Sequence, residues 1–420
     1  MARRPSRRRT ARTERRTLTI DRLGAAGDGL AGEVAVPFAL PGETVDAEVT
    51  GTKARVTVLT ETSPARAPAP CRHFGLPGDG CGGCKLQHLG EGFDTLWKAE
   101  RLTAALSRAG LEAPPLRVSI SAPRTRRRAK LAYLRTREGV RAGFRQLMSD
   151  RVVPLSECHL LAPELFDLAL ALSVLIGALP FRGIAEALIT MTETGADVAV
   201  SGVEEGALGV AAREAAARIA HDLGLARLTV GGVPLAELAV PSLRLGGVPV
   251  ALPTGAFLQA TPEGQAALTE AVMAAAAGAS SVADLYCGVG TFALPLSAGA
   301  RILAAEGDAA AADALKRAAH ASRRPVEVQT RDLATRPLQG AELADLDLVV
   351  LDPPRAGAAA QAAALAASAM PRIAYVSCDP ATLARDLRTL SPRYHLSHLT
   401  LVDQFRWSPH IEAVAVLERR

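Results

Sequence analysis

Two short segments place chemically reactive side chains at the ends of apolar runs. The sequence Ser-Cys-Asp-Pro occupies residues 377–380, and Leu-Asp-Pro-Pro-Arg occupies residues 351–355. A cysteine thiolate is a nucleophile, and a carboxylate accepts protons or hydrogen bonds. If both runs are parallel strands, Cys378 and Asp352 lie at the edge of one sheet where ligands bind. Either segment alone could be a plain strand end with a buried cysteine, but the two together favour an active site.

A third candidate group lies near the end of the chain. His410 and Glu412 precede an apolar run at residues 414–417 that is predicted as a final strand. Burial raises the pKa of a carboxyl group toward neutral pH, so Glu412 is a candidate general base. A thiol and a base suit covalent catalysis on a uracil ring. Thiolate addition at carbon 6 makes carbon 5 able to accept a methyl group, and the base then removes the carbon 5 proton.

A glycine-containing turn at residues 286–291 predicts a cofactor site. It follows an apolar run at 282–285, and Gly288 and Gly290 let the backbone approach a ligand closely. Glu306 lies 22 residues after Asp284, at the end of the next predicted strand, where a carboxylate can bind ribose hydroxyls. The Gly-x-Gly-x-x-Ala spacing also fits a nicotinamide dinucleotide, so an oxidoreductase is an alternative on this motif alone.

Four further cysteines predict a metal centre. They are Cys71, Cys81, Cys84 and Cys158. Two glycines separate the middle pair, a spacing that lets both thiolates reach one metal. Zinc and a [4Fe–4S] cluster both fit four thiolates, and His73 or His88 is an alternative fourth ligand. The basic N-terminus is followed by no apolar signal segment, so we expect a reducing, cytoplasmic location for these thiols.

Composition and pattern divide the chain into four segments. Residues 1–16 hold eight arginines against one glutamate, in a chain of net charge +5, and are predicted to be a disordered basic tail. Residues 17–62 contain short strands separated by turn residues, which predicts a small OB-like β-barrel. Residues 63–250, with the cysteine-rich loop at 71–90, are predicted as a central α+β domain. Residues 251–420 alternate strands with helices, which predicts a Rossmann-like α/β domain around a parallel sheet.

The individual elements follow from the same patterns. Helices are expected at residues 93–109, 165–179 and 262–277, and strands at 282–285, 302–305, 348–351 and 373–377. The 165–179 stretch is the longest apolar one, yet it is too short to span a membrane, so we expect a core helix and no membrane partner. A second arginine-rich stretch at 124–151 adds to the basic tail and predicts phosphate contacts with a nucleic acid.

Residues 250–420 resemble the RNA 5-methyluridine (uracil-5-) methyltransferase family. The matching stretches are 257–260 (Phe-Leu-Gln-Ala), 284–291, 351–357, 375–386 and 410–412 (His-Ile-Glu). The resemblance implies an S-adenosylmethionine-dependent enzyme in which Cys378 is the nucleophile and Glu412 the base. It places these residues at cofactor or pocket positions: Gln259, Tyr286, Thr291, Glu306, Asp332 and Asp352.

The N-terminal segments are also similar to those of family members. Residues 17–62 resemble the RNA-binding barrel called TRAM, and many members carry a [4Fe–4S] cluster at the place of the four cysteines. This architecture resembles the family's 23S ribosomal RNA enzymes more than its transfer RNA enzymes. The resemblance therefore implies a uridine of 23S rRNA as substrate, with a tRNA uridine as the alternative, and we expect a monomer.

Three departures from the family pattern stand out. Asp379 follows the nucleophile where Asn is common, and a carboxylate there would raise the pKa of the thiol unless it points away. Residues 405–410 read Phe-Arg-Trp-Ser-Pro-His instead of Phe-Pro-His-Thr-x-His, and residues 76–80 enlarge the gap after Cys71. Two other classes of methyltransferase do not fit Arg355. An N6-adenine methyltransferase has an aromatic residue after the prolines, and a 5-methylcytidine methyltransferase has a second cysteine there. A non-catalytic RNA-binding Fe–S protein is the alternative of another class.

Overall fold

The computed structural model describes residues 12–75, 80–147, 149–204 and 208–420. These residues form two compact units. The first contains the described residues up to 94 together with 144–153 and 407–409. The second contains 95–143, 154–406 and 410–420. Most of the predicted basic tail, residues 1–11, lies outside the described part. Within that part, no helix combines the length and apolarity needed to cross a membrane.

The first unit is built on a six-stranded sheet in the order β1-β5-β6-β4-β3-β2. Its strands are β1 (Thr13–Thr19), β2 (Arg22–Leu23), β3 (Gly29–Ala31), β4 (Val34–Val36), β5 (Thr44–Thr50) and β6 (Lys53–Glu61). In β5 every second side chain is buried in an apolar core, as expected for a sheet with one solvated face.

The start of this sheet corrects the predicted extent of the tail. Residues 13–16, expected to be disordered, belong to β1, which pairs with β5 from Thr13 opposite Thr50 onward. Arg15 lies opposite Glu48 in this register, so the strand pairs charges of opposite sign across the sheet. Dense arginines therefore do not prevent strand formation at this position.

A seven-stranded sheet forms the middle of the chain, in the order β10-β9-β8-β11-β12-β13-β14. Its strands are β8 (Arg128–Thr136), β9 (Gly139–Arg145), β10 (Val152–Pro154), β11 (Ile184–Thr192), β12 (Gly195–Ser201), β13 (Leu225–Val230) and β14 (Val233–Glu237). Helices α2 (Pro163–Gly177) and α3 (Val210–Asp222) accompany it. Helix α2 confirms the predicted core helix, because it buries Leu165, Leu172 and Ile176.

The C-terminal sheet has eight strands in the order β19-β18-β17-β20-β21-β23-β22-β7. They are β17 (Ser281–Leu285), β18 (Arg301–Glu306), β19 (Val326–Thr330), β20 (Leu348–Leu351), β21 (Arg372–Ser377), β22 (Tyr394–Asp403), β23 (Glu412–Arg419) and β7 (Leu116–Ile120). Strands β17 to β21 pair in parallel, whereas β23 runs antiparallel to both β21 and β22. The predicted parallel α/β sheet is confirmed, with an antiparallel addition at its C-terminal end.

Alternate residues of the central strands pack into two separate cores. In β20, Leu348 and Val350 belong to one core, and Val349 and Leu351 belong to the other. The first core contains residues of α4 (Pro262–Ala275) and α6 (Ala309–Ala321), and the second contains residues of α1 (Phe93–Arg108), α7 (Ala359–Ala367) and α8 (Pro380–Leu390). Helices therefore cover both faces, which explains why these strands are apolar throughout.

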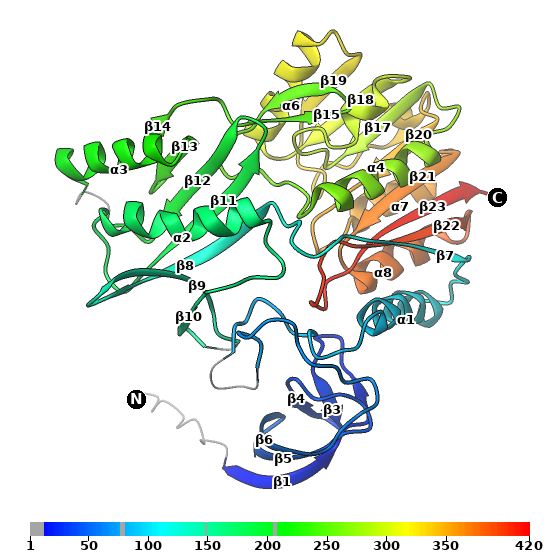
Figure 1. Ribbon diagram of the computed structural model, residues 1–420. Coiled ribbons are helices and arrows are strands. Elements are labelled where there is room, and N and C mark those ends of the chain that lie inside the picture. Colours follow the sequence, from blue (N-terminus) through cyan, green and yellow to red (C-terminus); the bar gives the residue numbers. More distant parts are fainter. Residues whose placement is uncertain (1–11, 76–79, 148, 205–207) are drawn as a thin grey trace, which may run out of the picture. The chain divides into compact units, whose positions relative to one another are not determined.

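The predicted boundary at residue 250 does not separate the central and C-terminal folds. Helix α1 packs in the C-terminal core through Leu102 and Leu106, and β7 extends the C-terminal sheet beside β22 (Figure 1). The hairpin of β15 (Ser242–Leu245) and β16 (Val248–Ala251) also buries its leucines and valines there. Pairing between distant segments joins these elements to the last domain, and no local pattern reveals such pairing.

Candidate active site

A cavity of about 820 Å³ opens at the carboxyl ends of the parallel strands. Strand β17 lies between β18 and β20, so the chain order reverses at this point, which is where open α/β sheets bind ligands. The cavity volume is typical of a site for a cofactor-sized molecule. Seven of the predicted site residues line it: Gln259, Tyr286, Glu306, Asp332, Asp352, Cys378 and Glu412. The eighth, Thr291, is not among the lining residues.

The turn after β17 brings the backbone to the cavity wall. Tyr286, Gly288 and Gly290 all have positive φ, at 63°, 54° and 99°. A Cβ on Gly290 would lie 2.5 Å from Leu315 Cδ1 of α6, and the φ of 99° is one that other residues rarely adopt, so glycine is strongly favoured in this turn. The turn is held to β18 because the Tyr286 amide donates to the Ala305 carbonyl at 2.8 Å.

Three carboxyl groups lie close together at the cofactor side of the cavity. Glu306 ends β18 and accepts from the Gly288 amide at 2.8 Å and the Asp308 amide at 2.7 Å. Burial and the charge of Glu306 raise the pKa of Asp352 to about 7. Asp284 is fully buried beneath them, and burial followed by the charge of Asp352 raises its pKa well above the ordinary value. So much negative potential in one place favours a cationic ligand.

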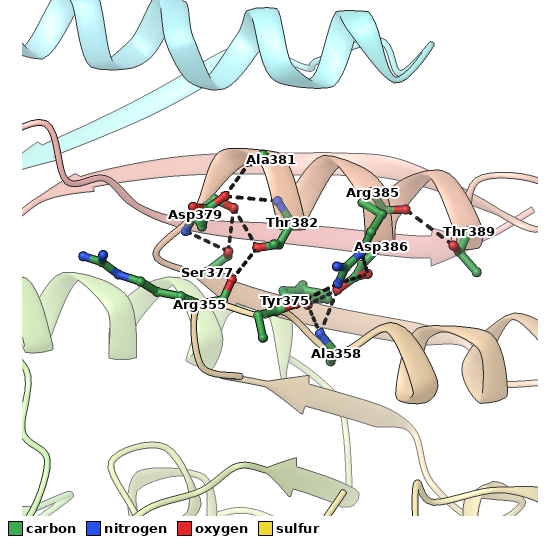
Figure 2. Close-up of polar contacts among 11 residues, drawn as sticks. Arg355, Ala358, Tyr375, Ser377, Asp379, Ala381, Thr382, Arg385, Asp386 and Thr389 are labelled. Atoms are coloured by element: carbon green, nitrogen blue, oxygen red, sulfur yellow. Dashed lines mark hydrogen bonds and ion pairs between the residues drawn. The ribbon is translucent and has the colours of Figure 1, made fainter. Parts of the chain in front are cut away.

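Cys378 follows β21 and is half-buried on the cavity wall. Burial and the charge of Glu412 raise the pKa of this thiol to about 11, while Arg355 opposes the shift. Asp379 is the N-cap of α8 and accepts from the amides of Ala381 and Thr382 at 2.8 and 3.1 Å (Figure 2). Its carboxylate therefore serves the helix terminus, and it is not among the groups that shift the thiol pKa.

The loop after β20 is fixed by a buried carboxylate of α8. Asp386 accepts from the Ala358 amide at 2.8 Å and from the Tyr375 hydroxyl at 2.6 Å (Figure 2). Gly357 has φ of 75°, and a Cβ there would lie 2.6 Å from Asp386 Oδ2. Thr382 Oγ1 also donates to the Arg355 carbonyl at 3.1 Å. These contacts set the backbone from which Arg355 reaches the cavity.

Glu412 opens β23 and is buried at 5 % exposure. Burial and the charge of Asp352 raise its pKa to about 8. Gln404 Nε2 donates to Glu412 Oε2 at 3.3 Å and to Gln259 Oε1 at 2.6 Å, and Gln404 Oε1 accepts from the Ala260 amide at 2.9 Å. One amide side chain thus joins the predicted base to a predicted pocket residue. The sequence analysis did not identify Gln404, since nothing in the local pattern distinguishes it from other strand-end residues.

Arg355 and His410 meet at the cavity with Phe405. Arg355 Nη2 lies 2.9 Å from His410 Nδ1, and the His410 ring meets the Phe405 ring edge-on at 5.7 Å between centroids. Arg126 lies 5.9 Å from the centroid of the Phe405 ring. Burial and four nearby cations, Arg355 first among them, lower the pKa of His410 to about 4. His410 is therefore a neutral residue in a positively charged environment.

Comparison with known proteins agrees with this geometry. The family model "tRNA (Uracil-5-)-methyltransferase" matches residues 252–420. An RNA methyltransferase of Caulobacter vibrioides is 42% identical, covering 96% of this chain and 99% of its own length. The 23S rRNA (uracil(1939)-C(5))-methyltransferase RlmD of Chromohalobacter salexigens is 34% identical, covering 96% and 89%. The chain belongs to the RNA (uracil-5-)-methyltransferase family.

A solved structure supports the same fold over the whole chain. The Pyrococcus abyssi tRNA (uracil-54, C5)-methyltransferase, solved with S-adenosyl-L-homocysteine, superposes with a TM-score of 0.74 at 22% identity. It covers 96% of this chain and 100% of its own. This similarity confirms the expected α/β architecture, and the sequence relatives, which establish the family, exclude the oxidoreductase alternative.

The loop that contains Cys71, Cys81 and Cys84, three of the four predicted metal ligands, lies in the first unit. The Cys81 amide donates to the His73 carbonyl at 2.7 Å, and the Gly83 amide points at Cys81 Sγ at 3.4 Å. Cys158 belongs to the second unit. Residues 76–79 of the enlarged gap lie outside the described part. Across the described ranges, no three histidine, cysteine or acidic side chains converge as a metal site. The four-cysteine centre remains a prediction.

Proposed function

We propose that this protein methylates carbon 5 of a uridine in 23S rRNA, with S-adenosylmethionine as the methyl donor. The observation that carries the proposal is one cavity lined by a half-buried thiol, Cys378, and a buried carboxyl of raised pKa, Glu412. Family membership gives the uracil carbon 5 chemistry, and the cavity contains the two groups that this chemistry requires.

The cofactor side of the cavity fits S-adenosylmethionine. Its sulfonium and ammonium charges match the carboxylates of Asp352 and Asp332, and its ribose hydroxyls match the Glu306 carboxylate. Gly288 carries no Cβ and has open space where one would lie, so the cofactor can approach the backbone. When bound, S-adenosylmethionine supplies an activated methyl group. We also assign Gln259, Tyr286 and Thr291 to the cofactor pocket. Gln259 and Tyr286 line the cavity, whereas Thr291 ends the turn at residues 286–291 without lining it.

Cys378 begins the reaction on the uracil ring. Its thiolate forms a bond to carbon 6, and the electron pair of the 5,6 double bond moves onto carbon 5 and the 4-carbonyl oxygen. Carbon 5 is then the nucleophile that accepts the methyl group. The thiol has to lose its proton first, and Arg355 is the neighbouring cation that lowers its pKa.

Glu412 completes the reaction. Its carboxylate takes the proton from carbon 5, the C–H electrons restore the 5,6 double bond, and the bond from sulfur to carbon 6 breaks to release the thiolate. The products are 5-methyluridine, S-adenosylhomocysteine and one proton. A buried carboxyl with a pKa of about 8 is well matched to this proton transfer near neutral pH.

The choice of RNA rests on the relatives. A relative whose name gives 23S rRNA as its substrate is 34% identical to this chain, whereas the solved tRNA enzyme is 22% identical. A tRNA uridine is the alternative substrate. A base inside folded RNA has to leave its stack to reach such a cavity, at a cost of a few kcal/mol. We propose that the basic tail, the TRAM-type sheet of the first unit and the arginines at 124–151 offset this cost through phosphate contacts.

We further propose that Cys71, Cys81, Cys84 and Cys158 bind a [4Fe–4S] cluster, and that the protein acts as a cytoplasmic monomer. The contact from the Gly83 amide to Cys81 Sγ supports a thiolate at that position. No step of the methylation requires redox chemistry, so the cluster has a structural or RNA-contacting role. Anaerobic purification should give about four iron and four sulfide per chain. Zinc in their place would overturn the assignment, and light scattering of the same sample tests the monomer.

Trapping with 5-fluorouridine RNA tests the function. Fluorine cannot leave carbon 5 as a cation, so the methylated adduct with Cys378 should persist on a denaturing gel. Cys378→Ala should form no adduct and should not methylate RNA, while Cys287→Ala retains the reactive thiol and should form it. Methylation by Cys378→Ala would overturn the mechanism, and absence of any adduct or methyl transfer in the wild type would favour a non-catalytic RNA-binding protein. Mapping 5-methyluridine in 23S rRNA and tRNA of a deletion strain decides the substrate.

A further inference from the structure

A buried ion pair lies directly behind the site and takes no part in the chemistry above. Lys98 Nζ donates to Asp403 Oδ1 at 2.6 Å, and neither side chain has any exposed surface. Thr95 Oγ1 donates to the second oxygen, Asp403 Oδ2, at 3.3 Å. Lys98 and Thr95 lie on α1, and Asp403 is the last residue of β22. The pair therefore ties a helix from the first quarter of the chain to a strand end in its last part.

Stability alone does not explain this pair. Removing two charges from water costs several kcal/mol per ion, and apolar residues of similar volume often stabilise a fold as well or better. The apolar contacts of Leu102 and Leu106 already anchor α1 to the C-terminal core. Lys98 makes a second bond that an apolar residue could not replace, because its Nζ also donates to the carbonyl of Phe405 at 2.9 Å.

The lysine thus holds both chain neighbours of Gln404, one by its side-chain carboxylate and the other by its backbone carbonyl. Asp403 and Phe405 are the chain neighbours of Gln404, and both accept hydrogen bonds from the same ammonium group. The Gln404 side chain is buried and donates to both Glu412 and Gln259. A shift of this backbone would move the amide that orients the Glu412 carboxylate.

We infer, on the basis of the proposed function, that Lys98 and Asp403 are positioning residues. They fix Gln404, and Gln404 in turn orients Glu412 for proton removal from carbon 5. Neither Lys98 nor Asp403 lines the cavity. The effect is specific to one step, because Cys378 directly follows β21, where its chain neighbours are joined by a hydrogen bond from Ser377 Oγ to the Asp379 carbonyl that does not involve Lys98. Loss of the pair should impair proton removal and leave thiolate addition and methyl transfer close to normal.

Two RNA substrates separate these steps. With 5-fluorouridine RNA, adduct formation reports thiolate addition and methyl transfer, since the later proton removal is blocked. With ordinary RNA, turnover requires proton removal, which is measured as release of tritium from carbon 5. We expect Lys98→Met to keep the rate of adduct formation within about threefold. Its turnover should fall about tenfold or more. This is less than the roughly 10²–10⁴-fold contribution of a positioned base, because Glu412 is misoriented but still present. Its adduct with ordinary RNA should accumulate.

A double variant guards against misfolding of the single one. Lys98→Met/Asp403→Leu leaves no unpaired buried charge and should fold, yet it still lacks the donor to the Phe405 carbonyl, so it should show the same split. The matched control is Arg227→Met, which breaks a different buried ion pair, Arg227 with Asp197, at 2.8 Å in the central sheet. That variant should be destabilised but should change both rates equally.

The pH dependence of the turnover rate is a second readout, because its acidic limb reports the pKa of Glu412. Glu412 is contacted or influenced by Gln404, Asp352, Arg355 and Cys378, and among these the Gln404 hydrogen bond and, to a smaller extent, the charge of Arg355 lower its pKa. Displacing Gln404 should move the limb to higher pH in both Lys98 variants. Equal loss of adduct formation and turnover, or normal turnover in the double variant, would overturn the inference. Failure of the wild type to form any adduct would instead overturn the proposed function.

Discussion

Glu412→Gln should make the protein more stable at neutral pH while stopping its turnover. Glu412 holds its proton up to a pKa of about 8 in the folded state, against an ordinary value of 4.5. Between these values the folded chain binds more protons than the unfolded chain, so the free energy of unfolding falls as pH rises. Glutamine does not ionise, so the free energy of unfolding of Glu412→Gln lacks this decrease with pH.

The size of the effect follows from the two pKa values. At 1.36 kcal/mol per pKa unit, the wild type should lose about 2.5 kcal/mol relative to the variant between pH 5 and pH 7. For a unit of about 300 residues with an unfolding entropy of ~2.1 cal/mol/K per residue, this corresponds to a Tm difference that grows by about 4 °C.

Thermal unfolding in the absence of RNA measures the effect directly. Tm is recorded for the wild type and Glu412→Gln at half-unit steps from pH 5 to 8. Glu418→Gln is the matched control, because Glu418 lies on the same strand with 42% of its side chain exposed. The control curve should run parallel to the wild type. If the Glu412→Gln curve also runs parallel, the carboxyl is not buried as described and its role as a base of raised pKa is refuted.

Three further substitutions test other parts of the site. Arg355→Met removes the cation that lowers the pKa of Cys378, so adduct formation at pH 7 should slow several-fold and recover as pH rises; an unchanged pH profile would contradict this. Asp379→Ala should cost about 1 kcal/mol of stability through the lost N-cap, measured by denaturant unfolding, without shifting the pH dependence of adduct formation, whereas Asp379→Asn should keep most of the cap. Gly357→Ala should destabilise the chain by about 1–3 kcal/mol, since its Cβ would clash with Asp386, and a neutral result would place the 353–358 loop elsewhere.

The sequence predicts the parts of the site that local pattern controls. Cys378, Asp352 and Glu306 each follow an apolar run, and the rule that parallel strands share a carboxyl edge brings them together. Glu412 instead precedes an apolar run, at the start of the predicted last strand. These positions require only that each run forms a strand, and the structure has β18, β20, β21 and β23 where the runs predict them.

The supporting contacts depend on pairing that no local pattern encodes. Strand β22 has a register shift between Leu396 and His398, which breaks the alternation of buried residues, and β7 is mostly exposed at the sheet edge. Neither was predicted as part of the sheet. Without them, Lys98 and Gln404 have no visible relation to Glu412, because about 300 residues separate the lysine from its partners.

The placement of α1 and β7 has a consequence for how the catalytic domain can be made. A fragment starting at residue 251 would lack β7 and α1, leaving the edge of β22 open and the leucine core around Leu383 uncovered. Such a fragment should aggregate even though it contains every predicted catalytic residue. During synthesis on the ribosome, β7 and Lys98 of α1 cannot contact their partners until the chain has been extended past residue 403. The contacts of Lys98 with Asp403 and Phe405 therefore form late, because about 300 residues separate them in the chain.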